Sequence, residues 1–138
     1  MITEYDPYQA PDPKAWLKTD EMTRIELVRK YHRRMRIKIP GERLHMVVHT
    51  IVENQAALGD ETPVQETLLR LMNEGLDRHE AIHAIGGVLL QHFLELTQNE
   101  NAADDEKLSE SYFEALRRLK ASDYQDPQKK TRKKRKNE

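Results

Sequence analysis

Four of the six histidines of the chain fall in two pairs with the same spacing. His45 and His49 form the first pair, in "LHMVVHTI", and His79 and His83 form the second, in "RHEAIHAI". Both segments read His-x-x-(Val/Ile)-His-x-Ile, and a spacing of four places the two rings of a pair on one face of a helix. Neutral imidazole is the commonest metal ligand in proteins. The duplicated pattern therefore predicts that two helices, packed antiparallel, bring four imidazoles to one metal site.

Residues near the two pairs extend this prediction. Glu53 continues the first histidine row one helical turn further on, which makes it a candidate fifth ligand or a partner of the ligands. Four nitrogens, or three with a carboxylate, suit a transition metal such as zinc, iron, nickel or copper. Gly86 and Gly87 follow His83 by one turn, and their missing side chains permit a close approach of the two helices.

Each pair taken alone has a simpler explanation. A histidine at the edge of an apolar helix face is often half-buried and bonds a neighbouring carboxylate or carbonyl group without any metal. His32 and His92 stand outside the duplicated pattern, and we expect both to be structural or surface residues.

The second pair also contains His-Glu-x-x-His, the motif of helical zinc proteases, in which the glutamate activates a water molecule. Glu80 is therefore the one candidate catalytic residue. Such an enzyme needs a third ligand, and Leu89 stands where the metzincin form of the motif continues with histidine. Asp77 and Glu80 also occupy the two positions of a capping box at a helix start. We expect Glu80 to cap this helix, and a metal-dependent hydrolase ranks as the third hypothesis for function.

Apolar residues at helical spacing predict about five helices, near residues 20–35, 42–58, 62–75, 77–97 and 105–121. Asp20, Thr62 and Asp77 are the expected N-caps. The expected inner faces include Met35, Leu44 and Phe93. Residues 1–13 contain three prolines and predict an irregular arm. With no strand pattern, the sequence predicts an all-α protein: a compact bundle forming one domain over residues 1–125.

The C-terminus differs from the rest of the chain in charge. The net charge of the protein is −1, yet seven lysines and arginines lie between Lys129 and Lys136. Residues 126–138 are too charged to pack, and we therefore expect them to form a disordered polybasic tail. Such a tail can bind polyanions, including nucleic acid. The second hypothesis is therefore a protein or nucleic-acid interaction module without catalysis. A homodimer is a further expected partner state, since a duplicated histidine helix can also form its site between two chains.

Composition bears on the compartment. The chain of 138 residues is 37% hydrophobic and 34% charged, and it has no cysteine. No apolar run approaches the roughly 18 residues that span a membrane. The N-terminus lacks the basic and apolar regions of a signal peptide. We expect a cytoplasmic protein with no membrane contact.

Two stretches resemble bacterial domain-of-unknown-function family 1841: "YDPYQAPDPKAWL" and "RLHMVVHTIVENQAALGDETPVQETLLRLMNEGLDRHEAIHAIG". The likeness covers roughly residues 5 to 96. The paired histidine segments, Glu53-Asn54-Gln55 and "GLDRHEAIHAIG" carry it. The resemblance implies a small all-helical protein of the bacterial cytoplasm and assigns no catalytic residue. The last expected helix and the basic tail lie outside it.

Overall fold

The computed structural model describes residues 2–35, 41–98 and 105–124. These residues form six α-helices, two short 3-10 turns and no strand, which confirms the all-α prediction for the described ranges. The helices are α1 (Pro13–Lys18), α2 (Glu21–Arg34), α3 (Glu42–Ala57), α4 (Val64–Asn73), α5 (Arg78–Gln98) and α6 (Asp105–Arg118). The basic tail predicted at residues 126–138 lies outside the described residues.

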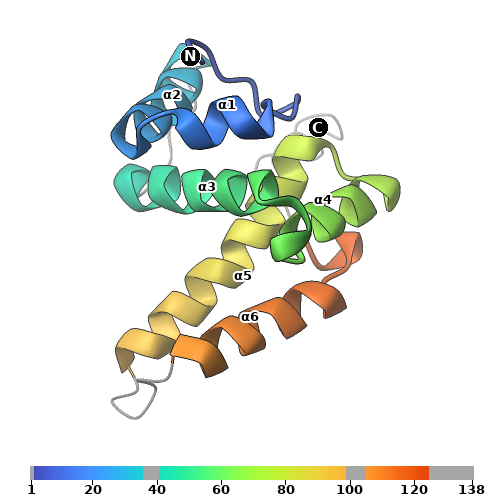
Figure 1. Ribbon diagram of the computed structural model, residues 1–138. Helices are drawn as coiled ribbons and strands as arrows, with labels where there is room; N and C mark the ends of the chain where they lie inside the picture. Colours follow the sequence, from blue (N-terminus) through green and yellow to red (C-terminus); the bar gives the residue numbers. More distant parts are fainter. Residues whose placement is uncertain (1, 36–40, 99–104, 125–138) are drawn as a thin grey trace, which may run out of the picture.

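Helix α3 lies at the centre of the arrangement (Figure 1). It contacts α1 and α2 on one side, and α4 and α5 elsewhere on its surface. Helix α5 crosses α3 obliquely, and α6 runs along α5 (Figure 1). Because α3 touches four other helices, its side chains connect the N-terminal part of the fold to the C-terminal part.

Side-chain caps set the helix starts much as the sequence predicts. The Asp20 carboxylate accepts a hydrogen bond from the Thr23 amide at the start of α2. At the start of α5, the Asp77 carboxylate accepts from the Glu80 amide and the Glu80 carboxylate accepts from the Asp77 amide. This reciprocal pair is a capping box. The predicted cap of α4 was displaced by one residue, because Pro63 rather than Thr62 is the N-cap.

Helix α1 is the element that the sequence prediction missed. Asp12 caps it by accepting from the Ala15 amide, and Pro13 occupies its first position, where the missing N–H costs nothing. The helix is only six residues long. Its Trp16 side chain is fully buried and donates a hydrogen bond to the Asn54 side chain on α3, 2.9 Å away. The N-terminal arm is therefore fixed onto α3.

Two apolar clusters adjoin α3. One lies among α3, α4, α5 and α6 and includes Val48 and Val52; the other lies among the N-terminal arm, α1 and α2 and includes Met46. Three residues predicted to face inward are instead about half exposed: Met35 (54%), Leu44 (50%) and Phe93 (47%). Val28, Tyr31 and His32 form the buried face of α2, and Met35 has the matching spacing but is the C-cap residue, after the last residue of the helix.

The glycines of α5 permit the close approach that the sequence predicts. A Cβ atom added at Gly86 would lie 3.0 Å from the Val48 side chain, closer than such contacts normally come. Helices α3 and α5 therefore meet more closely at this point than a larger residue would allow. Within the described residues, no helix combines the length and apolar character that a membrane crossing requires.

Candidate metal centre

Five imidazole rings from three helices lie together where α2, α3 and α5 meet. The duplicated pairs supply four of them, His45 and His49 from α3 and His79 and His83 from α5. The fifth is His32, from the last turn of α2. The expectation that His32 stands apart from the cluster was wrong. It follows Val28 by one turn on the buried face of α2, a signal that was present in the sequence.

The rings from α3 and α5 pair in opposite order along the two helices, as the antiparallel prediction requires. Ring centroids are 4.8 Å apart for His45 and His83, and 5.4 Å apart for His49 and His79. The His32 ring lies 5.2 Å from both His45 and His49. One possible ligand nitrogen from each of four residues lies within 4.8 Å of the other three: His32, His45, His49 and His83. His79 adjoins this group, with its ring 4.2 Å from that of His83.

Each of the five rings has one buried nitrogen without a hydrogen-bond partner in the described part of the chain. The atom is Nδ1 in His49 and Nε2 in His32, His45, His79 and His83. A buried polar atom left unpaired costs about 1–3 kcal/mol, and native proteins contain few of them. Five at one place lower the stability of the metal-free chain, and these nitrogens have no protein partner that would compete with a ligand.

The hydrogen bond of His32 decides which of its nitrogens is available. Its Nδ1 lies 2.8 Å from the carbonyl oxygen of Val28, which can only accept a hydrogen bond. Nδ1 therefore carries the proton and Nε2 has a free lone pair. A backbone carbonyl that fixes the tautomer in this way is a regular partner of metal-binding histidines.

A chain of hydrogen bonds fixes His49 in the opposite tautomer. The Tyr5 hydroxyl donates to the Glu53 carboxylate and lies 2.8 Å from His49 Nε2. Because the tyrosine proton is already directed to Glu53, the Tyr5 oxygen accepts from Nε2–H of His49. The lone pair of His49 is then on Nδ1, the nitrogen without a partner.

Arg78 completes this chain by bonding both side-chain oxygens of Glu53. Its guanidinium donates two hydrogen bonds to Glu53, of 2.7 and 2.8 Å, and a third to the carbonyl of Pro7 at 2.9 Å. The side chains of Arg78 and Glu53 are 5% and 1% exposed. A buried bidentate pair of this kind has defined geometry as well as strength. The charged pair thus orients Tyr5, and Tyr5 orients His49.

The electrostatic environment keeps the imidazoles neutral. Burial, followed by repulsion from His32, lowers the pKa of His45 to about 4. The same causes, with His45 and Arg78 added, lower the pKa of His79 to about 4, and burial with its histidine neighbours lowers that of His83 to about 2. The pKa of His49 is also well below its ordinary value, mainly through burial. At neutral pH the lone pairs are therefore not blocked by protons.

The two glutamates singled out from the sequence have structural partners. Both Glu53 oxygens bond Arg78, and one also bonds Tyr5, so Glu53 reaches the histidines through Tyr5. This placement fits a partner of the ligands, and direct coordination by Glu53 stays a prediction. Glu80 bonds the Asp77 amide in the capping box at the start of α5. The placement of Glu80 therefore favours the capping role over that of a water activator.

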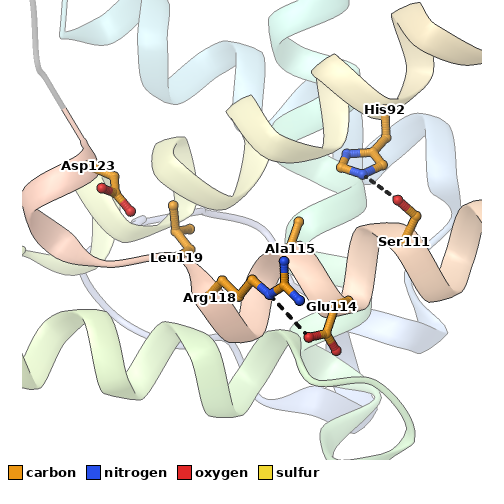
Figure 2. A pocket seen from close by; sticks show the side chains of 7 residues that line it. All are labelled: His92, Ser111, Glu114, Ala115, Arg118, Leu119 and Asp123. Atoms are coloured by element: carbon orange, nitrogen blue, oxygen red, sulfur yellow. Dashed lines mark hydrogen bonds and ion pairs between the residues drawn. The ribbon is translucent and has the colours of Figure 1, made fainter.

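His92 lies at a different place on α5, as expected. Its Nδ1 lies 2.9 Å from the Val88 carbonyl oxygen, and its Nε2 lies 3.1 Å from the Ser111 hydroxyl on α6. Figure 2 shows this contact in an open hollow, beside the ion pair of Arg118 and Glu114. Both nitrogens of His92 have partners, which makes it a matched control for the clustered histidines.

The functional proposal rests on the geometry of the site, because comparison with known proteins found no match. No family model, curated protein or solved structure matches this chain. The resemblance to family 1841 stays a prediction.

Proposed function

We propose that the protein binds one transition-metal ion through ring nitrogens of the four histidines that converge: His32, His45, His49 and His83. The observation that carries this proposal is the convergence of one ring nitrogen from each of these four residues, all within 4.8 Å of one another. Each of the four rings also has one buried nitrogen without a hydrogen-bond partner in the described part of the chain. His79 adjoins them and has a partnerless nitrogen of its own. Its coordination to the same ion stays a prediction.

The distances suit a metal ion after a small adjustment. Zinc–nitrogen bonds of 2.0–2.1 Å place tetrahedral ligand nitrogens roughly 3.3 Å apart. The four nitrogens lie within 4.8 Å of each other, so the widest pair closes by at most about 1.5 Å on binding. Rotation of the imidazole rings about their side-chain bonds is the adjustment that we expect on binding.

The ligand type favours some metals over others. An all-imidazole site suits zinc, iron, nickel or copper in the divalent state. Magnesium and calcium prefer oxygen ligands, and the group of converging residues found in the described chain contains no carboxylate. We therefore propose zinc, iron or nickel as the bound metal, with copper as a further candidate.

A metal titration tests the proposal directly. Wild-type protein should bind close to one equivalent of cobalt(II), used as a spectroscopic substitute for zinc, and the His83→Ala variant should lose this binding. The His92→Ala variant should bind as the wild type does, because His92 is bonded elsewhere. Equal binding by all three proteins, or by none, would overturn the proposal.

Tyr5 should influence affinity without being a ligand. In the Tyr5→Phe variant, His49 Nε2 loses its partner and the tautomer is no longer fixed. Loss of such a partner typically lowers metal affinity by about 10–100-fold. Competition against a chelator measures the change, and unaltered affinity in a folded variant would contradict the role given to Tyr5. Tyr8→Phe is the matched control, since it leaves unchanged the ring of Tyr8 that lies edge-on to His79.

A further inference from the structure

A small apolar pocket opens onto the histidine cluster between α3 and α5. Its volume is about 230 Å³. Four apolar side chains and three of the clustered imidazoles line it: Leu44, Val48, Ile82, Leu90, His45, His49 and His83. The Nε2 atoms of His45 and His83 and the Nδ1 atom of His49 are among the buried nitrogens without a partner. The pocket therefore connects the surface of the molecule with the proposed metal centre.

We propose that this pocket binds a small monoanion with a short apolar tail, whose anionic head lies against His45 and His83. The inference rests on the proposed metal function, since the metal would supply the positive charge that attracts the head. The pocket is smaller than the 300–1,000 Å³ typical of drug-sized ligands. A short-chain carboxylate has the required size and chemistry.

The charge balance of the site favours an anion. A divalent ion held by neutral imidazoles retains its charge in a buried place, and such a charge is costly unless it is paired. Glu53 is the carboxylate connected to the cluster, and its charge is already paired with Arg78. No residue that lines the pocket, among those the structure describes, has an acidic or basic side chain other than histidine. A bound anion can supply the missing negative charge.

The apolar walls favour a tail on that anion. The head would occupy the end of the pocket formed by the imidazoles, against His45 and His83, and the tail would lie against the aliphatic side chains. Each methylene group removed from water contributes a roughly fourfold gain in affinity. Butyrate should therefore bind on the order of tenfold more tightly than acetate.

Gly87 offers a way to block the pocket without disturbing the fold. It lines the pocket, is exposed, and has no atom within 4 Å of the position where a Cβ would lie. Because Gly87 is inside α5, a larger residue also improves helix propensity. Gly87→Leu should fill the pocket, and Gly87→Ala is the matched control that adds a single carbon. Gly86 is unsuitable, since a Cβ there meets Val48 at 3.0 Å.

The experiment measures the visible spectrum of cobalt(II)-loaded protein during titration with acetate, butyrate and 1-butanol. Cobalt stoichiometry is determined first, and a wild type without bound cobalt would overturn the proposed function and this inference together. With cobalt bound, butyrate should change the spectrum at lower concentration than acetate, and 1-butanol should leave it unchanged. Gly87→Leu should retain cobalt but weaken butyrate binding at least about tenfold, while Gly87→Ala should stay near the wild type.

Three outcomes would overturn the proposal that the pocket binds an anion, while leaving the proposed metal centre intact. The first is a cobalt spectrum that no carboxylate alters. The second is equal affinity for 1-butanol and butyrate, which removes the role of charge. The third is unchanged butyrate affinity in cobalt-loaded Gly87→Leu, which would show that the ligand enters elsewhere.

Discussion

Replacement of Arg78 by methionine should lower the free energy of unfolding by about 3–5 kcal/mol, among the largest effects expected for a single substitution in this protein. The substitution leaves the Glu53 carboxylate, 1% exposed, without its bidentate partner. An uncompensated buried charge is far more costly than the loss of the pair as a whole. Urea denaturation of the metal-free proteins, followed by circular dichroism, measures the difference.

The double variant Glu53→Gln/Arg78→Met is the control for this prediction. It removes the buried charge along with its partner, while the glutamine oxygen can still accept from Tyr5. It should recover most of the stability lost in the single variant. A single variant that loses less than about 1 kcal/mol, the range of exposed ion pairs, would show that Glu53 and Arg78 do not form a buried pair in solution.

Acidification should destabilise the metal-free protein steeply between about pH 7 and pH 5. The pKa values of His45, His79 and His83 are lowered in the folded state to about 4, 4 and 2, whereas in the unfolded chain they take the ordinary value. Between the two values the unfolded state binds more protons, so stability falls as the pH falls. The stability contributed by these neutral histidines is fully present above the pKa of the unfolded chain and is lost progressively below it.

Urea midpoints measured at several pH values check this prediction. The slope of unfolding free energy against pH gives the number of protons taken up on unfolding, which should exceed two near pH 5. Measurements above pH 5 contain little contribution from carboxyl groups, because most of these titrate at lower pH. His92→Ala should leave the slope unchanged, and His79→Ala should reduce it. A midpoint that is the same at pH 7 and pH 5 would contradict the buried, neutral state of the cluster.

The sequence predicted those parts of the site that depend on local periodicity. A spacing of four fixes two rings on one helix face whatever the rest of the fold does, so the pairs of α3 and α5 could be identified in advance. The capping box of Asp77 and Glu80 is local in the same way. The close packing of α3 and α5 at Gly86 was also predicted correctly, because a residue without a side chain permits a short distance between two helices.

The contributions of His32 and Tyr5 could not be found by the same means. His32 has no histidine partner on α2, and its role depends on which face of that helix meets α3. Met35 was predicted to face inward at the same helical spacing as His32, but it is the C-cap residue of α2 and is 54% exposed. Tyr5 reaches its partners across 44 and 48 residues of sequence, from an arm predicted to be irregular. Periodicity places His32 on the buried face of α2, but tertiary packing brings His32 and Tyr5 to the histidine pairs.

The hypothesis of an interaction module depends on residues outside the described ranges. Lys129 to Lys136 stay a predicted polyanion contact, and a homodimer stays a predicted state. The metal proposal does not require either of them, because the four converging histidines belong to one chain.

Metal analysis of the untagged protein, purified without chelator, shows whether the histidine cluster holds a transition metal. We expect about one zinc, iron or nickel ion per chain in the wild type and in His92→Ala. The His32→Ala variant should contain none, which also tests the placement of His32 in the cluster. A wild type that contains no metal, and takes up none when zinc, iron and nickel are added, would contradict the account. The five imidazoles would then be packing residues.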